Sequence, residues 1–290
     1  PRNPGAQEET AASFARAVRH LMAEEEGMVL VHGNGPQVGM ILLRIEATKD
    51  RIPPETLDIM VAETQGSIGY LLSRSLRSEI PEREVAALLT EVLVDPDDPG
   101  FANPTKPVGP FYSREAADEL IRSQGWRMTE SPGRGWRRVV PSPRPQEIVE
   151  LHTIKDAVSH GHLIIAGGGG GVPVIKDQNG ALQGIEAVID KDLTACKLAV
   201  AIEAERFVIL TDVPHVSTGF ATESERGIKR MTASAARRLL AEGEFPPGSM
   251  GSKVEASAIF AEATGRSALI TNVQQLESAL KDEAGTWIDP

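Results

Sequence analysis

The 290-residue sequence contains a single cysteine, Cys196. One cysteine excludes an internal disulfide and a metal cluster built on thiolates. The sequence also lacks a secretory signal and an apolar run long enough to span a membrane, so we expect a cytoplasmic protein without a membrane partner. Its formal net charge of −11 at pH 7 argues against a nucleic-acid partner, because the phosphate backbone repels an acidic surface. Any site for an anion must therefore be built locally.

The first residue is Pro1 and not methionine, so we expect residues to be missing from the front of the chain. The length suits one large α/β domain or two lobes that share a sheet. Apolar runs alternate with segments of helical periodicity, which favours the α/β class.

The segment from Glu186 to Ile202 predicts a short strand that runs into a helix. Asp190 has the short acceptor side chain typical of a helix N-cap. Lys191 then falls in the first turn, where the helix dipole disfavours a cation by about 0.3–1 kcal/mol. Either Asp190 and Asp192 neutralise Lys191 in a solvated cap, or a bound anion holds the lysine there.

A predicted buried strand over residues 28–32 ends at Gly33-Asn34-Gly35, and a helix opens at Pro36. This order places free backbone N–H groups at the carboxyl end of a strand, where anionic ligands bind in open α/β folds. The alternative is a tight turn that needs glycine backbone angles. A P-loop is excluded because no Gly-Lys-Ser/Thr follows.

Five consecutive glycines, Gly167–Gly171, lie between apolar strands predicted at 161–166 and 172–175. Such a composition is typical of a flexible linker. Between two strands, however, it favours close approach of the backbone to a ligand, or a nest of N–H groups that binds an anion.

A second lysine, Lys253, lies near the start of a glycine-rich helix predicted to open at 246 and to stop at Gly265. Another predicted strand, 206–211, also ends in polar residues. Two lysines at helix starts, together with these strand ends, indicate a phosphate site.

Other helices are predicted at 7–26, where Phe14, Val18, Leu21 and Met22 have helical spacing, and at 54–78. Gly66 and Gly69 in the second helix each cost about 1 kcal/mol against alanine, which indicates close packing against a neighbouring backbone.

Residues 85–94 are predicted to form a strand, and the proline-rich stretch 95–110 an irregular connection. A helix is predicted at 114–124. Residues 133–145 carry four arginines: either a mobile arm closes over an anion, or a hairpin pairs its arginines with surface acids.

These motifs together resemble the carbamate kinases of the amino acid kinase superfamily. The resemblance runs in family order from about Glu8 to the C-terminus. Its motifs are His32-Gly-Asn-Gly-Pro-Gln-Val-Gly39, Val94-Asp-Pro-Asp-Asp-Pro99, Asn103-Pro-Thr-Lys-Pro107, Gly133-Arg-Gly-Trp-Arg-Arg-Val-Val-Pro-Ser-Pro143, Gly167–Pro173, Ala187-Val-Ile-Asp-Lys-Asp192, Leu210-Thr-Asp-Val213 and Pro247-Gly-Ser-Met-Gly-Ser-Lys253. Single members of this set are unspecific, and the whole set is highly specific.

The resemblance implies a three-layer αβα sandwich around a mostly parallel sheet, assembled as a homodimer. It implies a carbamate and carbamoyl-phosphate lobe at about 1–180, a nucleotide lobe at about 181–290, and an inserted arm at about 111–150. The implied reaction is reversible phosphoryl transfer between ATP and carbamate with Mg²⁺, running in cells mainly from ADP and carbamoyl phosphate to ATP. Arginine, agmatine and purine breakdown all remain open as sources of carbamoyl phosphate.

The resemblance also implies roles for individual residues. Lys191 and Lys253 would hold the transferring phosphoryl group, and Asp192 would orient the two lysines. Residues implied to bind the substrate are Gly33, Asn34, Gly35, Gly167, Gly168, Gly169, Gly170, Arg137 and Arg138. Residues implied to bind the nucleotide are Leu210, Thr211, Asp212, Val213, Met250, Gly251 and Lys253. No metal ligand from the protein is predicted.

Three features depart from the family pattern. The family begins with a strand and a Gly-Gly-Asn loop that touches the phosphates, and we expect a segment of roughly 15–20 residues bearing them to be missing here, since a central strand is rarely dispensable. Pro214–Thr218 replaces an aspartate and an aromatic near the nucleotide, so nucleotide affinity or preference is expected to differ. Ser252 stands where proline is common, which we expect to change little.

Two alternatives keep the fold. One is an enzyme that acts on another small acid or phosphate acceptor. The other is a nucleotide-binding paralogue without catalysis.

Overall fold

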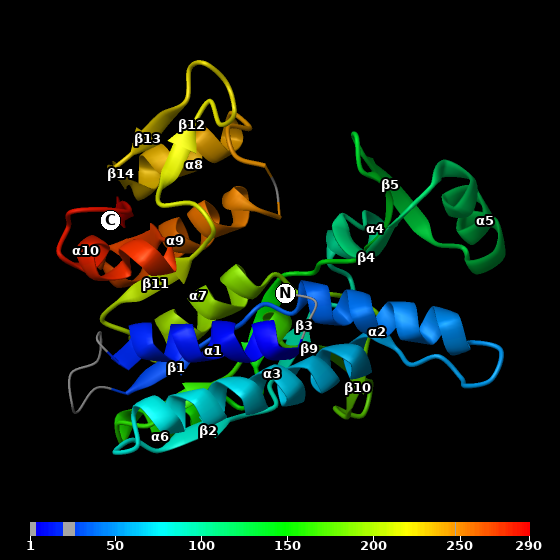
Figure 1. Cartoon of the computed structure of the whole chain (residues 1–290), viewed down its shortest axis with the longest axis horizontal. Coiled ribbons are helices and arrows are strands. Elements are labelled where there is room, and N and C mark those ends of the chain that lie inside the picture. Colours follow the sequence, from blue (N-terminus) through cyan, green and yellow to red (C-terminus); the bar gives the residue numbers. More distant parts are fainter. Residues whose placement is uncertain (1–3, 20–26, 247) are drawn as a thin grey trace.

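The computed structural model describes residues 4–19, 27–246 and 248–290, and its mixed α/β architecture agrees with the predicted fold class (Figure 1). The first lobe has a parallel sheet in the order β1-β8-β2 and a second sheet in the order β10-β9-β3-β7. The strands are β1 (Met28–Leu30), β2 (Val85–Ala87), β3 (Glu91–Val94), β7 (Pro145–Ile148), β8 (Leu163–Ile165), β9 (Val172–Lys176) and β10 (Leu182–Gly184). The helices are α1 (Pro4–Arg19), α2 (Gly35–Thr48), α3 (Leu57–Glu79) and α6 (Leu151–Ser159).

The parallel sheet of this lobe is covered by helices on both faces. Because side chains alternate along a strand, Leu163 and Ile165 of β8 point to one face and pack against α1 and α3. Ile164 lies between them and packs on the other face against α6 and against α7 (Lys191–Ala201). The lobe is therefore a helix–sheet–helix sandwich, and α7 belongs to its core.

An arm stands apart from both lobes at the upper right of Figure 1. It comprises α4 (Pro99–Ala102), β4 (Lys106–Tyr112), α5 (Arg114–Gln124), β5 (Arg127–Ser131) and β6 (Gly135–Val140), with the sheet order β4-β6-β5. Strand β7, which follows, pairs with β3 and returns the chain to the first lobe. Val108 and Val140 at the base of the arm pack with Leu57 and Val38 of the body.

The second lobe has a sheet in the order β11-β15-β16-β14. Its strands are β11 (Phe207–Leu210), β14 (Arg230–Thr232), β15 (Ala268–Thr271) and β16 (Thr286–Asp289), beside the hairpin of β12 (Val216–Thr218) and β13 (Arg226–Ile228). Its helices are α8 (Ala233–Ala241), α9 (Met250–Thr264), the 3₁₀ turn η2 (Val273–Gln275) and α10 (Leu276–Leu280). Phe207 and Phe260 meet in its core with ring centroids 5.2 Å apart.

Several predicted segments differ from the structure. Residues 85–94 form two strands in different sheets. Thr90 lies between them, and its backbone C=O and N–H form hydrogen bonds with Val172 N and with the side chain of Gln65. Residues 186–189 are irregular: Val188 N donates to Pro141 O and joins no ladder.

The predicted irregular stretch 95–110 is wrong at the short helix α4 and again from Lys106 onward, where β4 begins. Pro107 and Pro110 are tolerated there because β4 is an edge strand of the arm sheet. The strand predicted as buried at 28–32 is only half-buried, because β1 is also an edge strand. The predicted end of the first helix, with Leu21 and Met22, lies outside the described residues.

The two glycines of α3 have different surroundings. A Cβ on Gly69 would lie 2.9 Å from the Ala87 methyl group, so the predicted close packing is confirmed there, although the neighbour is a side chain and not a backbone. A Cβ on Gly66 would meet nothing within 4 Å, so for Gly66 the expectation of a neighbour within the described chain is wrong.

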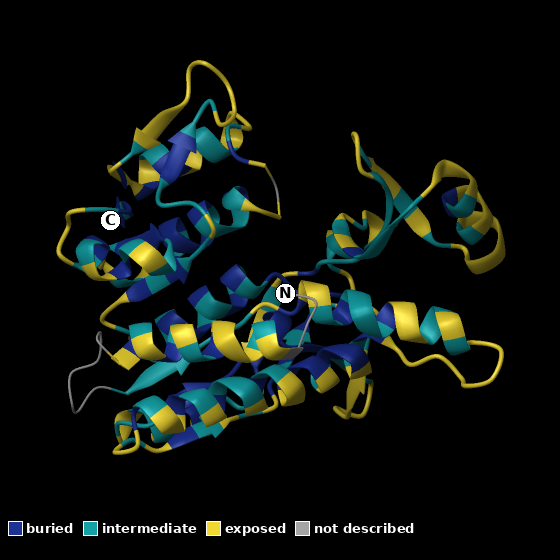
Figure 2. Ribbon diagram, viewed as in Figure 1, coloured by how far each residue is buried: buried dark blue, intermediate teal, exposed yellow. Residues whose placement is uncertain are grey.

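No helix among the described residues is long and apolar enough to cross a membrane. Burial follows the layers: Figure 2 shows dark, buried segments on the strands and on the inner faces of α7 and α9, and exposed residues along the outer faces of α2 and α3.

Candidate functional site

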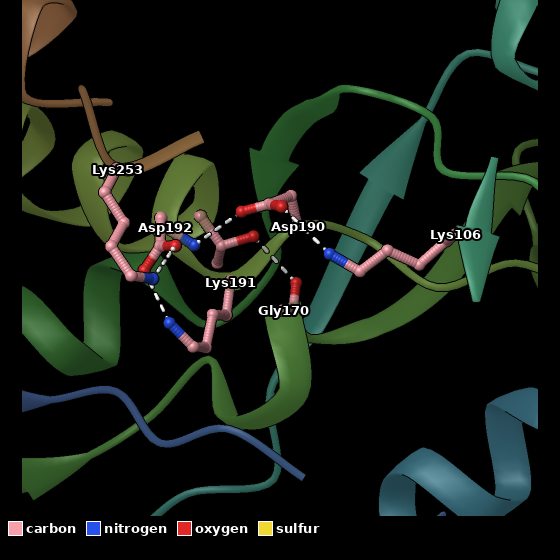
Figure 3. Close-up of polar contacts among 7 residues, drawn as sticks. Lys106, Gly170, Asp190, Lys191, Asp192 and Lys253 are labelled. Carbon is pink, nitrogen blue, oxygen red and sulfur yellow. Dashed lines mark hydrogen bonds and ion pairs between the residues drawn. The ribbon is translucent and has the colours of Figure 1, made fainter. Parts of the chain in front are cut away.

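The start of α7 is built as the sequence predicts, with Asp190 as its N-cap. Asp190 Oδ1 accepts a hydrogen bond from the N–H of Asp192 at 2.9 Å, which satisfies one of the free donors of the first turn. The predicted cap is confirmed, and the capped turn directs three charged side chains into one place (Figure 3).

Asp192 joins the two lysines that the sequence singles out. Its Oδ1 lies 2.6 Å from Lys191 Nζ, and its Oδ2 lies 2.8 Å from Lys253 Nζ on α9. Asp192 is buried, with 6% of its surface exposed. Burial, with the charge of Lys191, lowers the pKa of Lys253, and Asp192 opposes that shift. The predicted phosphate-site lysines, 62 residues apart in sequence, thus share one buried carboxylate.

A third lysine, Lys106, comes from the base of the arm. Its Nζ lies 2.9 Å from Asp190 Oδ2. Burial alone would raise the pKa of Asp190, but the charge and hydrogen bond of Lys106, the N–H of Asp192 and the hydroxyl of Ser252 lower it to about 2. The predicted site residues do not include Lys106. Its position within Asn103-Pro-Thr-Lys-Pro107 was the available signal.

The cluster of Lys106, Lys191 and Lys253 with Asp190 and Asp192 has three positive and two negative groups, a net charge of +1 in a chain whose formal net charge is −11. Lys191 is the most exposed of the three lysines, at 35% of its side chain, and Lys253 is 13% exposed. Ammonium groups preorganised on buried carboxylates can bind an anion without paying to order their own side chains. The arrangement can hold a phosphoryl group.

The turn after β1 lies beside this cluster. A Cβ on Gly33 would lie 3.4 Å from the aliphatic chain of Lys191, an ordinary van der Waals distance, so Gly33 lies directly beside the lysine. Asn34 is buried, and its Nδ2 donates to Thr64 Oγ1 of α3 at 2.9 Å. Gly35 opens α2, where a Cβ would meet nothing within 4 Å. The structure therefore brings Gly33 to the lysines and turns the Asn34 side chain into the interior.

The glycine run of residues 167–171 packs tightly under this turn. A Cβ on Gly169 would lie 2.1 Å from Asn34 Nδ2, and one on Gly170 would lie 2.2 Å from Ile189 O. The N–H groups of Gly167, Gly169, Gly170 and Gly171 donate to Thr90 Oγ1, His32 O, Gly167 O and Gly168 O at 2.8–3.1 Å. The predicted anion nest is therefore wrong for these four N–H groups, and the run works by close packing.

Two polar side chains that were not predicted from the sequence hold the glycine run in place. Gln65 of α3 donates to Gly168 O at 2.9 Å and accepts from the N–H of Thr90 at 2.7 Å. Thr194 Oγ1 of α7 donates to Gly170 O at 2.7 Å (Figure 3). Gln65, Thr90 and Thr194 are all buried, so these hydrogen bonds fix α3 and α7 against the run.

The arginines of the arm are held mainly by aromatic rings. Arg137 lies over Phe111 at 5.1 Å and donates to Gly109 O, and burial followed by the charge of Arg134 lowers its pKa. Arg138 lies over Trp126 at 4.6 Å and pairs with Glu186 at 3.3 Å.

Arg144, between β6 and β7, pairs with Glu255 of α9. The predicted hairpin is confirmed, and its predicted pairing with acids holds for Arg138 and Arg144. These contacts join Arg137 to Gly109 and Arg138 to Glu186, and neither arginine is joined by them to the lysine cluster, so their substrate role stays a prediction.

The predicted nucleotide residues lie in two places of the second lobe. Leu210 ends β11 and Thr211–Val213 follow it; the N–H of Thr211 donates to Thr271 O at 2.9 Å. Met250 and Gly251 open α9, one turn before Lys253. A hollow of about 270 Å³ adjoins Gly251; it is lined by Leu240, Gly243, Phe245, Gly248, Gly251, Ser252 and Glu255. Since this hollow does not include Leu210–Val213, the shared nucleotide pocket stays a prediction.

Metal-ligating side chains do not gather in the part of the chain that the structure describes: it has no group of three or more His, Cys, Asp or Glu residues that could hold an ion. Both oxygens of Asp192 and both of Asp190 already have partners. Magnesium is commonly bound by substrate phosphates and water with one or two carboxylates, so such an ion would fit here only with its ligands supplied mainly by a bound nucleotide.

The sequence and the structure were compared with known proteins, and both comparisons point to one family. The family described as "Amino acid kinase family" matches residues 5–272. A carbamate kinase from Pyrococcus furiosus is 44% identical over 282 residues, which cover 95% of this chain and 90% of the relative.

Solved structures agree with that relative. Carbamate kinase from Giardia lamblia bound to AMP-PNP has a TM-score of 0.89 at 36% identity, and the match covers 99% of this chain and 92% of that one. The same enzyme thiocarbamoylated by disulfiram on a cysteine has a TM-score of 0.85 at 36% identity, with the same coverage.

Proposed function

The chain belongs to the amino acid kinase family and, within it, to the carbamate kinases, and we propose that it catalyses reversible phosphoryl transfer between ATP and carbamate. The observation that carries this proposal is the pair of ammonium groups on the two oxygens of buried Asp192. A local cluster of positive charge in an acidic chain is explained if it binds a phosphoryl group.

Phosphoryl transfer passes through a loose transition state whose charge is spread over the equatorial oxygens. The protein therefore needs no nucleophile; it positions the reactants and supplies cations. Lys191 and Lys253 are in place for this role, since Asp192 keeps both ammonium groups close together and oriented. A bound phosphoryl group would also stabilise the charged form of Lys253, whose pKa is lowered chiefly by burial.

The acceptor side of the site is proposed to lie between Gly33 and the base of the arm. Gly33 lies against Lys191, and Lys106 reaches the same cluster through Asp190. A carbamate or carbamoyl phosphate between them would meet cations from two directions. The glycine run of residues 167–171 supports this place from beneath, as the packing of Gly169 against Asn34 indicates.

The nucleotide is proposed to bind the second lobe near Leu210–Val213 and Met250, with its terminal phosphate at Lys253. The AMP-PNP complex of the Giardia relative supports a nucleotide in this family. When Mg²⁺ is bound with the nucleotide, it would supply positive charge that offsets part of the charge of the phosphates. The lysines of this chain remain the cations that the protein itself provides.

We further propose that the enzyme works in cells toward ATP, that arginine metabolism is one source of its carbamoyl phosphate, and that it is a homodimer. The cytoplasmic location inferred from the sequence stays a prediction.

The test is the formation of ATP from ADP, Mg²⁺ and carbamoyl phosphate, with acetyl phosphate as the comparison. Turnover with carbamoyl phosphate and little with acetyl phosphate supports the proposal. Preference for another acyl phosphate would show that the acceptor is another acid and not carbamate. Binding of ADP without turnover of any acyl phosphate would contradict a catalytic function.

A further inference from the structure

His32 lies two residues after β1 and contacts the glycine run of residues 167–171 in two ways. Its backbone C=O accepts a hydrogen bond from the N–H of Gly169 at 2.8 Å. Its ring occupies the space beside Gly168, where a Cβ would lie 2.3 Å from His32 Nε2 and 2.4 Å from Cε1. Glycine at position 168 therefore leaves the room that this ring fills.

The ring of His32 also holds the turn that follows it. Its Nδ1 lies 3.1 Å from Gly33 O. A carbonyl oxygen can only accept, so Nδ1 is the donor and carries a proton. Burial lowers the pKa of His32 more than the hydrogen bond to Gly33 O raises it, so the ring is neutral at pH 7. A neutral ring with its proton on Nδ1 has none on Nε2.

The direction of the Gly33 carbonyl fixes the direction of the next N–H group. The peptide bond between Gly33 and Asn34 is trans, so its C=O and its N–H point in opposite directions. While this C=O faces the His32 ring, the N–H of Asn34 faces away from the ring. The Asn34 side chain is fixed as well, because its Nδ2 donates to Thr64 Oγ1 at 2.9 Å.

The N–H groups of this turn are unused by the part of the chain that the structure describes. Those of Gly33, Asn34 and Gly35 have no acceptor among the described residues. Asn34 is only 6% exposed, and a backbone N–H on a buried residue rarely stays without an acceptor. Gly33 and Gly35 are exposed and neither has a positive φ, so the alternative of a turn that needs glycine backbone angles is wrong. Without side chains at these two positions, a ligand can approach the turn closely.

We propose that His32 is a positioning residue of the acceptor side: its Nδ1–H holds the Gly33 carbonyl and so directs the N–H of Asn34 to an oxygen of bound carbamoyl phosphate. This role rests on the proposed function, because it needs carbamoyl phosphate as the ligand. Lys191, whose aliphatic chain lies beside Gly33, supplies positive charge at the same turn. In this role His32 acts through the peptide group and exchanges no proton with the reactants.

The first test determines the tautomer of His32. Long-range proton–nitrogen correlation NMR spectra of the wild type, labelled with ¹⁵N-histidine, distinguish a ring protonated at Nδ1 from one protonated at Nε2 or at both nitrogens. The His32 signals are those that His32→Gln or His32→Leu lacks. At about pH 7 we expect a proton on Nδ1 alone. A ring protonated at Nε2 alone, or a charged ring, would overturn the proposal.

The second test separates the hydrogen bond from the packing of the ring. Asparagine places an amide N–H where the Nδ1–H of histidine lies, whereas glutamine places one where Nε2 lies. His32→Asn should therefore keep most of the activity. His32→Gln and His32→Leu should lose at least about tenfold in kcat/KM for carbamoyl phosphate, while KM for ADP stays within about twofold of the wild type. His152→Asn, exposed on α6, is the matched control and should change neither constant.

Thermal unfolding of the same variants separates positioning from folding. Asparagine leaves the larger gap beside Gly168, so we expect His32→Asn to be less stable than His32→Gln and yet more active. Equal activity of these two variants, or a similar rise in KM for ADP and carbamoyl phosphate, would contradict the proposal. A wild type that does not turn over carbamoyl phosphate would overturn the proposed function and this role together. An active wild type with the other tautomer would overturn this role alone.

Discussion

Asp190 and Asp192 organise the site because each holds a lysine from a different part of the chain. Asp192 binds Lys253 of α9 and Lys191 of its own helix, and Asp190 binds Lys106 of the arm. One helix start thus connects both lobes and the arm. A buried carboxylate is stable there only because it is fully paired, so removing either partner leaves an uncompensated charge.

The pairing of Asp190 gives stability a specific pH dependence. The pKa of Asp190 is lowered from 3.8 in the unfolded chain to about 2 in the folded protein. A lowered carboxyl pKa stabilises the folded state above pH 3.8, and that contribution, about 2 kcal/mol, is lost as pH falls toward 2. We expect Asp190→Asn to lose this dependence. Urea unfolding at pH 2–5 measures it, with the exposed Asp118→Asn as the control. Equal pH slopes for wild type and Asp190→Asn would contradict the pairing.

The single cysteine is expected to be inert. Cys196 is 2% exposed, and burial raises its pKa to about 12, so at pH 8 only about one molecule in ten thousand carries the thiolate that reacts. Disulfiram, which thiocarbamoylates a cysteine of the Giardia relative, should leave activity unchanged here. Titration with a thiol-specific chromophore should be at least about a hundredfold slower in the native protein than in denaturant. Rapid native labelling with loss of activity would show that this thiol is accessible.

At the scale of elements, the glycine run fixes α7 against the first sheet. Gly170 combines a positive φ of 100° with a Cβ position 2.2 Å from a backbone oxygen, that of Ile189. Gly133 in the arm hairpin has a similar backbone, with φ 73°, and open space.

We therefore expect Gly133→Ala to cost about 1 kcal/mol from backbone strain alone, and Gly170→Ala to cost more than about 3 kcal/mol because the backbone must also move. Denaturant midpoints compare the two variants. If both variants lose the same free energy of unfolding, the close approach of the backbone at Gly170 does not contribute to stability.

Much of this scaffold could be predicted from local sequence. The helix starts at Asp190 and Thr232 follow from side chains that cap, and Lys253 follows from its place in the first turn of α9. Such signals involve neighbours in sequence, so a single sequence is sufficient to find them.

Long-range partners could not be predicted from those patterns. Lys106 contacts Asp190, which is 84 residues away in the sequence. The prolines around Lys106 indicate a loop, whereas the structure has an edge strand there. Gln65 looks like an ordinary helix residue until its contact with Gly168, 103 residues away, is known. For the glycine run, the sequence predicted free N–H groups that could bind an anion, but the fold itself supplies acceptors for them.

At the scale of the whole molecule, we expect the nucleotide to bind the second lobe and carbamoyl phosphate to bind the first lobe and the base of the arm. ADP with Mg²⁺ should slow hydrogen exchange in segments 208–213 and 249–254 of the second lobe. Carbamoyl phosphate should slow it at 31–35 in the first lobe and at 105–108 of the arm base. Mass spectrometry of deuterated fragments resolves these segments. Protection by ADP confined to the first lobe would contradict the division.

The central claim is that Lys191 and Lys253, held by Asp192, carry the transferring phosphoryl group. The most direct test is the rate of ATP formation from ADP and carbamoyl phosphate by Lys191→Ala and by Lys253→Ala, with Lys197→Ala elsewhere on α7 as the control. We expect each site variant to lose roughly 10²–10³ in turnover, as for the loss of one preorganised donor, with folding and the control intact. Full activity in both site variants would contradict the account.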